Sequence, residues 1–275
     1  AASDVYKRQE QALDFIARYV VNGVSEQVNI PRRTAPSEPE KPREFSPPAH
    51  DISPKRVMAY LIKTRGIDPE IVKSMIQQKM IAEDSVHHNC LFFGRDEIGV
   101  IRSCALRGST DVKFRGEAPG GDKSCTFAMV GHNDVLRLFE SPIDAMSHAT
   151  FTKLLGKDWT ADHRLSVNGS GNYESIKRYL ANHTEIKSVW FCYDSDQAGR
   201  DGAEASSVRI FEDFPDRELS VMFCSPVKNK DWNEALQLYR VLESHGVTVR
   251  EFLAPTEFRS IPPPDCEQDE FECEL

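Results

Sequence analysis

The pattern of hydrophobic and polar positions divides the 275-residue chain into stretches of different character. Apolar residues recur at helical spacing over 10–28, which predicts a helix there. Prolines interleaved with charged residues then fill 31–54, a composition typical of an extended linker. The segments expected to build a hydrophobic core therefore follow this linker.

Two short helices are expected next, over 54–65 and 69–80. Each is preceded by a capping residue and begins with a proline, which lacks only an N–H group that the first helical turn leaves unpaired in any case. These pairs are Ser53-Pro54 and Asp68-Pro69. Gly66 is expected to end the first helix. The pattern thus predicts a compact helical pair.

Shorter, strand-like pieces separated by glycines occupy 89–130, and they predict a small antiparallel unit. After Gly131, short apolar runs alternate with helical segments. The runs lie at 135–140, 164–169, 188–196 and 219–224, and the helices at about 142–154, 173–182, 200–211 and 231–241. This alternation predicts a parallel α/β sheet with crossover helices.

The composition is that of a globular protein, because 40% of the residues are apolar. No stretch approaches the roughly 18 consecutive apolar residues of a membrane span, and the N-terminus lacks the basic-then-apolar pattern of a signal peptide. We therefore expect a cytoplasmic protein without a membrane partner. The seven cysteines never occur at C-x-x-C spacing, so no zinc ribbon is expected.

The net charge of −9 is unevenly distributed along the chain. Six acidic residues and no basic one lie within 265–275, so the remaining residues together carry only −3. The predicted helical pair, by contrast, has six basic residues against two acidic ones over 55–79. Two interpretations of this basic segment stay open: a solvated helix face, or a contact with nucleic acid.

Acidic residues fall where the predicted parallel strands end. Glu140 ends the first apolar run, and Asp144 lies in the first turn of the helix that follows it. Asp194 and Asp196 end the third run, and strand alternation would point both to the same side. Because ligands of open α/β sheets gather at the carboxyl ends of the strands, we expect these carboxylates at one edge of the sheet.

Three carboxylates at one edge repel each other and raise one another's pKa unless a cation neutralises them. Oxygen ligands of this kind suit Mg²⁺, which keeps several waters and bridges to substrate phosphates. The pattern therefore predicts a Mg²⁺ site. The alternative is a set of acidic helix caps that bind nothing.

Two motifs in this region resemble the Toprim domain, which bacterial primases share with topoisomerases, recombination-repair proteins and certain nucleases. FESPIDAMS (139–147) resembles its strand that ends in Glu and precedes a helix with Asp, and YDSDQAGRDGA (193–203) resembles its Asp-x-Asp-x-x-Gly motif. The resemblance covers roughly residues 130–240. It implies that the catalytic and metal-binding residues are Glu140, Asp194 and Asp196, supported by Asp144 and Gly199. Gly169, in the turn after the second strand, is a supporting candidate that could bring its backbone N–H to a phosphate, with an ordinary turn as the alternative.

Other segments resemble primases in particular. SPVKNKDWNEAL (225–236) is similar to a primase segment with Lys-Asp-x-Asn/Asp-Glu, which implies Asp231 as a further metal carboxylate with Lys230 beside it. DVKFRGEAPGGDKS (111–124) occupies the place of the basic stretch that binds nucleic acid. The candidates for gripping a template or nucleotide phosphate are Arg102, Arg107, Lys113 and Arg115, with ordinary surface charge as the alternative.

The chain also departs from the primase pattern. Ser141-Pro142 stands where primases have Gly after the catalytic Glu, a variant that resembles the uncharacterised Toprim proteins of bacterial plasmids and transposons. The basic stretch is diluted by acidic residues, and no zinc domain is visible. These departures bear on polymerase activity and leave the predicted metal site unaffected.

The predicted fold class is therefore α/β, a Toprim, Rossmann-like parallel sheet flanked by helices and preceded by a small α+β primase-like subdomain. The expected divisions are a helical remnant at 1–30, a Pro-rich linker at 31–52, a nucleic-acid-binding subdomain at 53–130, the Toprim catalytic domain at 131–241 and an extension with an acidic tail at 242–275.

Three classes of function stay open. The leading one is a primase-like nucleotidyltransferase that depends on Mg²⁺ or Mn²⁺ and serves the replication or transfer of a bacterial mobile element. Its expected partners are single-stranded DNA, NTPs, and a helicase or relaxase. A Toprim nuclease or strand-nicking enzyme would share the carboxylates without an NTP site, and a DNA-binding module would have kept the site without catalysis.

Overall fold

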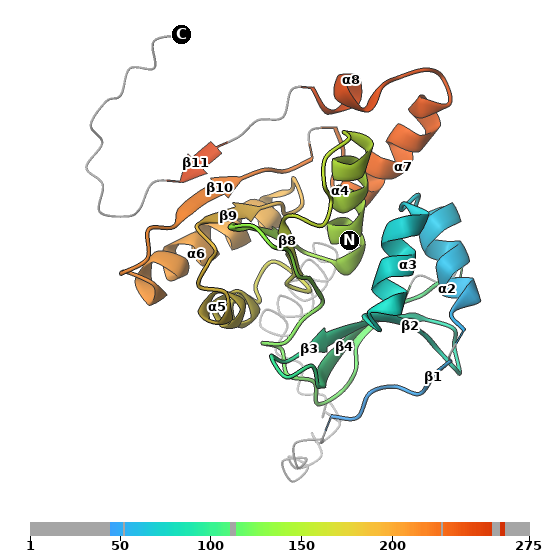
Figure 1. The fold of residues 1–275 in the computed structure, drawn as a ribbon, viewed down its shortest axis with the longest axis horizontal. Coiled ribbons are helices and arrows are strands. Elements are labelled where there is room, and N and C mark those ends of the chain that lie inside the picture. Colours follow the sequence, from blue (N-terminus) through green and yellow to red (C-terminus); the bar gives the residue numbers. More distant parts are fainter. Residues whose placement is uncertain (1–44, 52, 111–113, 227, 255–258, 262–275) are drawn as a thin grey trace, which may run out of the picture. The chain divides into compact units, whose positions relative to one another are not determined.

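The structure is a computed structural model, and it describes residues 45–51, 53–110, 114–226, 228–254 and 259–261 (Figure 1). The helix expected over 10–28, most of the Pro-rich linker and the acidic tail from Asp265 lie outside the described residues. Within the described part no helix combines the length and the apolar character needed to cross a membrane. All of the described residues belong to one compact unit, which begins at Pro42.

The predicted helical pair is present. The first helix consists of α2 (Lys55–Ala59) and a π-helical continuation, η1 (Tyr60–Thr64), and the second is α3 (Pro69–Gln77). Gly66 ends the first helix with a φ of 72°, and the next residue, Ile67, donates its N–H to the carbonyl of Leu61. The side chain of Asp68 caps α3 by accepting the N–H of Glu70, as expected.

The start of α2 is capped differently from the prediction. Ser53 does not cap it, because the helix begins one residue later and its N-cap, Pro54, has no side-chain acceptor. The buried carboxylate of Glu83 takes this role and accepts the N–H groups of Arg56 and Val57. The capping group therefore comes from a strand 26 residues further along the chain, where local spacing cannot reveal it.

The predicted antiparallel unit is a five-stranded sheet in the order β1-β2-β3-β4-β5. Its strands are β1 (His50–Asp51), β2 (Ile81–Asp84), β3 (Cys90–Arg95), β4 (Ile101–Arg107) and β5 (Arg115–Glu117). Every pairing is antiparallel. The two first strands were not expected from the sequence, since both are short and β2 carries two acidic residues.

The second sheet has the order β11-β10-β9-β7-β8-β6, and its four central strands are parallel. The parallel strands are β7 (Val135–Phe139), β8 (His163–Ser166), β9 (Ser188–Phe191) and β10 (Ser220–Phe223). Two short strands, β6 (Ala128–Met129) and β11 (Arg259–Ile261), close its edges in antiparallel pairing. The assignment of 125–130 to the antiparallel unit is thus wrong for β6, which pairs with β8 instead.

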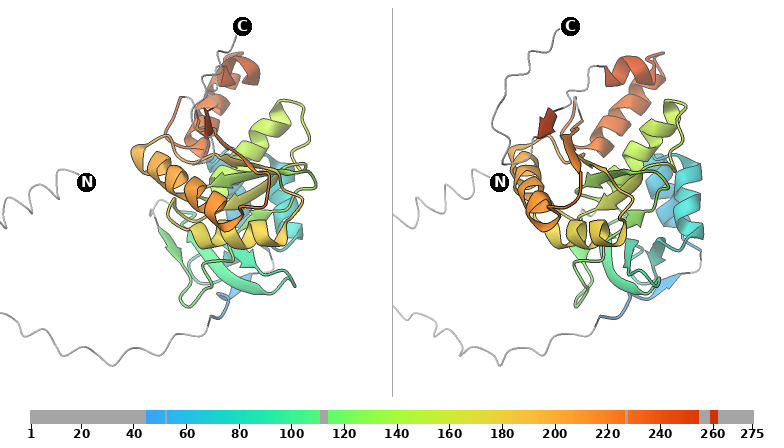
Figure 2. Two further views of the ribbon diagram at one scale, coloured as in Figure 1. Left: turned by 90° about the vertical axis from the view of Figure 1, so that its left-hand side faces the viewer. Right: turned by 60° about the vertical axis from the view of Figure 1, so that its left-hand side comes forward.

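Helices cover both faces of the parallel sheet, which confirms the predicted fold class (Figures 1 and 2). They are α4 (Pro142–Leu154), α5 (Tyr173–Asn182), α6 (Gln197–Asp213), α7 (Trp232–Glu243) and the short α8 (Val249–Leu253). On β7, Leu136 and Leu138 point to the core shared with α5 and α6, and Phe139 points to the core shared with α4 and α7. Alternation along the strand explains this division.

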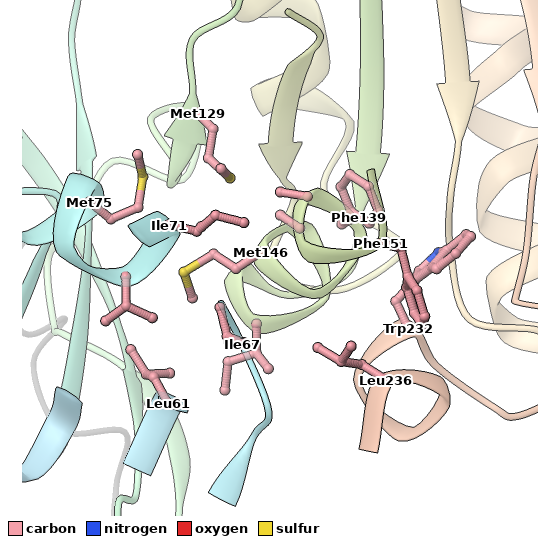
Figure 3. Packing of buried hydrophobic residues seen from close by; sticks show 14 of the residues in the cluster. Leu61, Ile67, Ile71, Met75, Met129, Phe139, Met146, Phe151, Trp232 and Leu236 are labelled. Carbon is pink, nitrogen blue, oxygen red and sulfur yellow. The ribbon is translucent and has the colours of Figure 1, made fainter. Parts of the chain in front are cut away.

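One hydrophobic core joins the helical pair to the parallel sheet (Figure 3). Ile71 and Met75 of α3 belong to the same buried cluster as Met146 of α4 and Trp232 of α7. Each fully buried large apolar side chain stabilises the folded state by roughly 1.5–3 kcal/mol. The helical pair is therefore fixed against the sheet by apolar burial, which holds the antiparallel sheet close to the carboxyl ends of the parallel strands.

Candidate metal and nucleic-acid site

Glu140 follows β7 directly and is half-buried. The next residue, Ser141, caps α4 by accepting the N–H of Asp144, and Pro142 occupies the first helical position, as predicted. The carboxylate of Glu140 accepts the backbone N–H of Asp194 at 3.2 Å. The ends of two neighbouring parallel strands thus bring the two sequence motifs into contact.

Asp194 and Asp196 lie beyond the end of β9, which stops at Phe191. Strand alternation was therefore the wrong reason for placing them on one side. Asp196 is instead the N-cap of α6 and accepts the N–H of Gly199 at 2.9 Å. Ser195 between them is bonded to the segment that carries Lys230, with its N–H donated to the carbonyl of Lys230 at 2.8 Å and its hydroxyl to that of Asn229 at 2.9 Å.

Gly199 allows the first turn of α6 to lie against the two motifs. A Cβ atom at this position would be 2.2 Å from the carbonyl oxygen of Asp194 and 3.1 Å from the Glu140 carboxylate. Real Cβ atoms do not approach a backbone oxygen so closely. The glycine of the Asp-x-Asp-x-x-Gly motif is thus required by space, since its φ is not positive.

Lys230 supplies a positive charge between the two aspartates. Its ammonium lies 3.1 Å from a carboxylate oxygen of Asp196 and 3.7 Å from one of Asp194. The next residue, Asp231, caps α7 by accepting the N–H of Glu234 at 2.7 Å. The segment that resembles the primase Lys-Asp sequence is therefore brought to the same edge of the sheet.

Burial and mutual repulsion perturb the carboxylates of this edge. Burial raises the pKa of Asp194 to about 7, and the nearby Glu140, Asp144 and Asp231 add to the shift. Burial also raises the pKa of Glu140. The pKa of Asp196 is lowered, first by the N–H of Gly199 and then by Lys230. One carboxylate is thus held ionised while its neighbours resist ionisation.

These residues suit a hard divalent cation. The described residues contain two groups of three ligand atoms that lie within 4.8 Å of one another, and the four carboxylates of this edge do not form either group. Mg²⁺ does not require such a closed cage, because it binds through one or two carboxylates and keeps its waters. The carboxylates of Asp194 and Asp196 can bind an ion in this way, because Asp194 is repelled by the neighbouring carboxylates and Asp196 already pairs with one cation, the ammonium of Lys230.

Asp144 has a different position from the other carboxylates, because it is buried beneath them. It accepts the hydroxyl of Ser141 at 2.5 Å and the backbone N–H of Asn233 at 3.1 Å. Burial raises its pKa to about 7, and the charge of Asp231 contributes next. The structure therefore makes Asp144 a link between α4 and α7.

Asn233 is a functional candidate that the sequence did not reveal. Its buried side chain donates to the carbonyl of Arg65 and to the hydroxyl of Ser147, and accepts from the Arg65 guanidinium at 3.0 Å. The available signal was its place beside Asp231 in the primase-like segment. Through Asn233 the acidic edge is connected to the basic helical pair.

A cavity of about 720 Å³ opens beside Glu140. One wall comes from β4 and β5 of the antiparallel sheet, and the other from the loop after β8 and the start of α4. Its basic lining residues are Arg107, Arg115 and Lys123, and the loop contributes residues 168–172, including Gly169. The amide of Gly169 is engaged, since it donates to the Glu140 carbonyl at 3.0 Å.

Arg107 and Arg115 are directly opposite each other on paired strands. Like charges in this arrangement are unfavourable. Among the described residues, neither guanidinium has an ion pair or a hydrogen bond that would offset the repulsion. Arg115 also acts electrostatically on Glu140, which it helps to keep ionised. Within the described part of the chain, the two arginines therefore present positive charge to the cavity without a bonded counter-ion.

The remaining basic candidates are placed elsewhere. Arg102 does not line this cavity and donates to Asp96 at 2.7 Å within the β3–β4 hairpin. Lys113 lies outside the described residues. Lys123, a member of the diluted basic stretch at 111–124, does line the cavity, and its carbonyl accepts a hydrogen bond from the side chain of Asn172.

Two family models match successive parts of the chain. Residues 59–133 match a family described as a protein of unknown function, DUF3991, and residues 137–236 match a family described as Toprim-like. An uncharacterized protein of Bacillus anthracis, pXO2-78, is 30% identical over 158 residues, which are 53% of this chain and 44% of that protein. The match therefore spans less than half the length of this curated relative.

Solved structures of primase cores have a similar fold. The primase fragment of the bacteriophage T7 primase-helicase protein is 17% identical, with 66% of this chain and 71% of that chain covered and a TM-score of 0.48. The E. coli primase catalytic core is 18% identical, with 76% and 68% covered and a TM-score of 0.44. By the family models alone, the chain carries a Toprim-like domain at 137–236, preceded by a DUF3991 domain at 59–133.

Proposed function

We propose that the protein acts on nucleic acid as a Mg²⁺- or Mn²⁺-dependent, primase-like nucleotidyltransferase. The observation that carries the proposal is the pair Arg107 and Arg115, which face the Glu140 carboxylate across one cavity. A chain of phosphates carries negative charge that would neutralise these arginines. Phosphates also bind Mg²⁺, which would bridge them to the carboxylates of the acidic edge. A polyanion lying along the cavity would bring its phosphates to the carboxylates.

The metal would be held by Asp194 and Asp196 of the Toprim-like motif and by Asp231 of the primase-like segment. The chemistry that a bound ion adds is neutralisation of charge on the phosphate oxygens. Asp196 is ionised throughout the neutral range because its pKa is lowered, whereas Asp194 becomes ionised only near its pKa of about 7. We therefore expect the affinity for Mg²⁺ to rise between pH 6 and about 8.

Glu140 would be a further ligand or the general base that takes the attacking hydroxyl proton. Its pKa is raised by burial, which brings it closer to the range in which a carboxylate accepts a proton effectively at neutral pH. Glu140 lines the cavity in which a substrate would lie, whereas Asp194 and Asp196 are not among the residues that line it. Lys230 would orient the two aspartates.

The setting of this activity is part of the proposal. Single-stranded DNA and NTPs are the proposed substrates, a helicase or relaxase is the proposed partner, and a bacterial mobile element is the proposed context. The Ser141-Pro142 variant of the first motif supports that context through its resemblance to plasmid and transposon proteins. We place the activity in the cytoplasm.

The test is incorporation of labelled NTPs on a single-stranded DNA template in the presence of Mg²⁺. We expect Asp194→Asn to lower the rate by roughly 100-fold or more, as the loss of a group that acts in the chemical step does. Arg115→Ala should weaken DNA binding and reduce the slope of log Kd against log salt by about one. Arg250→Ala, on an exposed position of α8, is the control and should behave as wild type.

A nuclease is the second candidate, because it would use the same carboxylates. Strand cleavage that needs Mg²⁺ and Asp194 but no NTP would replace the primase proposal with this one. DNA binding that survives Asp194→Asn, with neither synthesis nor cleavage in the wild type, would leave a binding module and would contradict both enzymatic functions.

A further inference from the structure

Two histidines and a glutamate meet at the edge of the parallel sheet opposite to the acidic site. His163 begins β8, His183 directly follows α5, and Glu185 lies in the loop before β9. Because these parallel strands start here, this edge is the far one from Glu140 and Asp194, which follow the strand ends. One ligand atom of each residue lies within 4.8 Å of those of the other two.

The distances in this group suit a metal ion. Nδ1 of His183 is 2.9 Å from a carboxylate oxygen of Glu185, and Nε2 of His163 is 3.9 Å from the same oxygen. Ligand atoms around a tetrahedral Zn²⁺ with bonds near 2.1 Å are about 3.4 Å apart. The two distances lie on either side of this value, so shifts of about half an ångström would bring both to it.

His163 supplies a second, independent observation. Its side chain is almost completely buried, with 1% of the residue exposed, and its Nδ1 is hydrogen-bonded to the hydroxyl of Tyr179 at 2.9 Å. Its Nε2 is buried and forms no hydrogen bond of normal geometry with a described residue, although the backbone of Asn133 and the carboxylate of Glu185 both act on the pKa of this ring. A buried polar atom without a partner is rare in proteins and costs about 1–3 kcal/mol.

The arrangement of His163 is the one expected of a metal ligand. Histidines that bind metals usually have their other ring nitrogen fixed by a hydrogen bond, which sets the tautomer and directs the free lone pair to the ion. Tyr179 provides this bond, and its ring also stacks on His183, with centroids 4.2 Å apart. One tyrosine thus orients both imidazoles.

The loop that carries His183 and Glu185 is held in place by Arg217. This guanidinium donates to the backbone carbonyls of Leu180, His183 and Ile186, on both sides of Glu185. The ligands are therefore presented by a fixed loop on one side and by a strand on the other. Fixed ligands lower the entropic cost of binding an ion.

We propose that His163, His183 and Glu185 bind a divalent transition-metal ion, with Zn²⁺ as the best match. Two imidazoles and one carboxylate are borderline donors that suit Zn²⁺ better than Mg²⁺. Glu185 is about half exposed, with 52% of its side chain accessible, so a water molecule can complete the coordination. The bound ion fastens the α5–β9 loop to β8 and is separate from the Mg²⁺ site proposed above.

The test is titration of the metal-free chain with Zn²⁺ by calorimetry and with Co²⁺ by visible absorption. Co²⁺ reports nitrogen ligands and a tetrahedral geometry through its d–d bands. We expect His183→Gln and Glu185→Gln to weaken binding at least about tenfold, the loss typical of altered metal sites. These side chains are partly exposed, so both variants should fold, which circular dichroism checks.

Two controls make the result specific. His245→Gln removes an exposed histidine on another surface, and Asp194→Asn/Asp196→Asn removes the acidic site. Both should bind Zn²⁺ as the wild type does. Equal affinity in wild type, His183→Gln and Glu185→Gln would overturn the proposal, as would Zn²⁺ binding that is lost only in the Asp194→Asn/Asp196→Asn variant. Neither result bears on primer synthesis, which is measured with Mg²⁺.

Discussion

Gly199, in the first turn of α6, lies close to the carbonyl of Asp194 and to the carboxylate of Glu140. A methyl group at this position would need the backbone of the Asp194 loop to move. That loop is also held by Ser195, whose hydroxyl and amide bind the carbonyls of Asn229 and Lys230. The glycine thus contributes to the site through the space that it leaves.

We predict that Gly199→Ala destabilises the protein by roughly 1–3 kcal/mol, the usual cost of overpacking. The sign of this change in the free energy of unfolding is informative. In a helix with open space around the glycine, the same substitution would stabilise the protein by up to about 1 kcal/mol. The measurement is urea denaturation of the metal-free protein. Gly171→Ala is the matched control, because a Cβ atom there meets nothing within 4 Å. A Gly199→Ala protein as stable as wild type would contradict the close approach.

The sequence predicted which acidic residues come together, but it did not predict which other side chains lie near them or near each other. The spacing of the two motifs can be recognised without knowledge of the fold, and it was enough to select Glu140, Asp194 and Asp196. The opposition of Arg107 and Arg115 depends on the register of β4 and β5, which residue spacing does not contain. The histidine pair was missed for the same reason, since its members meet only through the topology of the sheet.

Among the elements, α7 connects the most parts of the site. Its N-cap is Asp231, its first residue donates the indole N–H of Trp232 to the Cys192 carbonyl, and its second residue is Asn233. The Asn233 side chain bonds both α4 and the end of the helical pair. The helix therefore sets the distance between the acidic edge and the basic helices.

We predict that Asn233→Ala lowers the free energy of unfolding by about 2–4 kcal/mol, because it removes three side-chain hydrogen bonds and leaves buried groups unpaired. It should also lower activity, since Asp144 and Asp231 flank it. Chemical denaturation measures the first effect. Gln77→Ala on the exposed end of α3 should cost no more than about 0.5 kcal/mol. Equal losses in the two variants would show that the Asn233 network does not stabilise the fold.

Elements with strong periodicity were predicted well, and short ones were not. The helices α4 and α5 have the predicted bounds because a capping residue or an amphipathic face defines each of them. The strands β1 and β2 escaped prediction because each depends on its partner for stability. The π-helical turn η1 follows from packing against the core, where Tyr60 and Leu61 are buried.

For the whole molecule, burial and repulsion of the carboxylates at the acidic edge make the free energy of unfolding depend on pH. The pKa values of Asp194 and Asp144 are raised from 3.8 to about 7 in the folded protein. Between about pH 4 and 7 the folded state therefore binds more protons than the unfolded state. The contribution of these two groups to stability is complete below about pH 4 and is lost as the pH rises through 7.

We predict that Mg²⁺ reverses this loss, because it binds the ionised carboxylates of the folded state only. Guanidinium denaturation at pH 5 and pH 8 should show little effect of Mg²⁺ at the lower value and stabilisation at the higher one. Asp194→Asn, which cannot ionise, should flatten the pH profile of the metal-free protein. A pH profile that is unchanged by this substitution would show that the pKa of Asp194 is not raised in the folded state.

The basic wall of the cavity and its carboxylate come from different domains. Arg107 and Arg115 lie within the DUF3991 match and Glu140 within the Toprim-like match, while β6 extends from the first region into the sheet of the second. A gene fragment encoding either region alone would yield only part of the cavity wall, and the Toprim-like region alone would lack β6 at the edge of its sheet. We therefore expect related genes to carry the segments that encode the two regions together, although the two regions match separate family models.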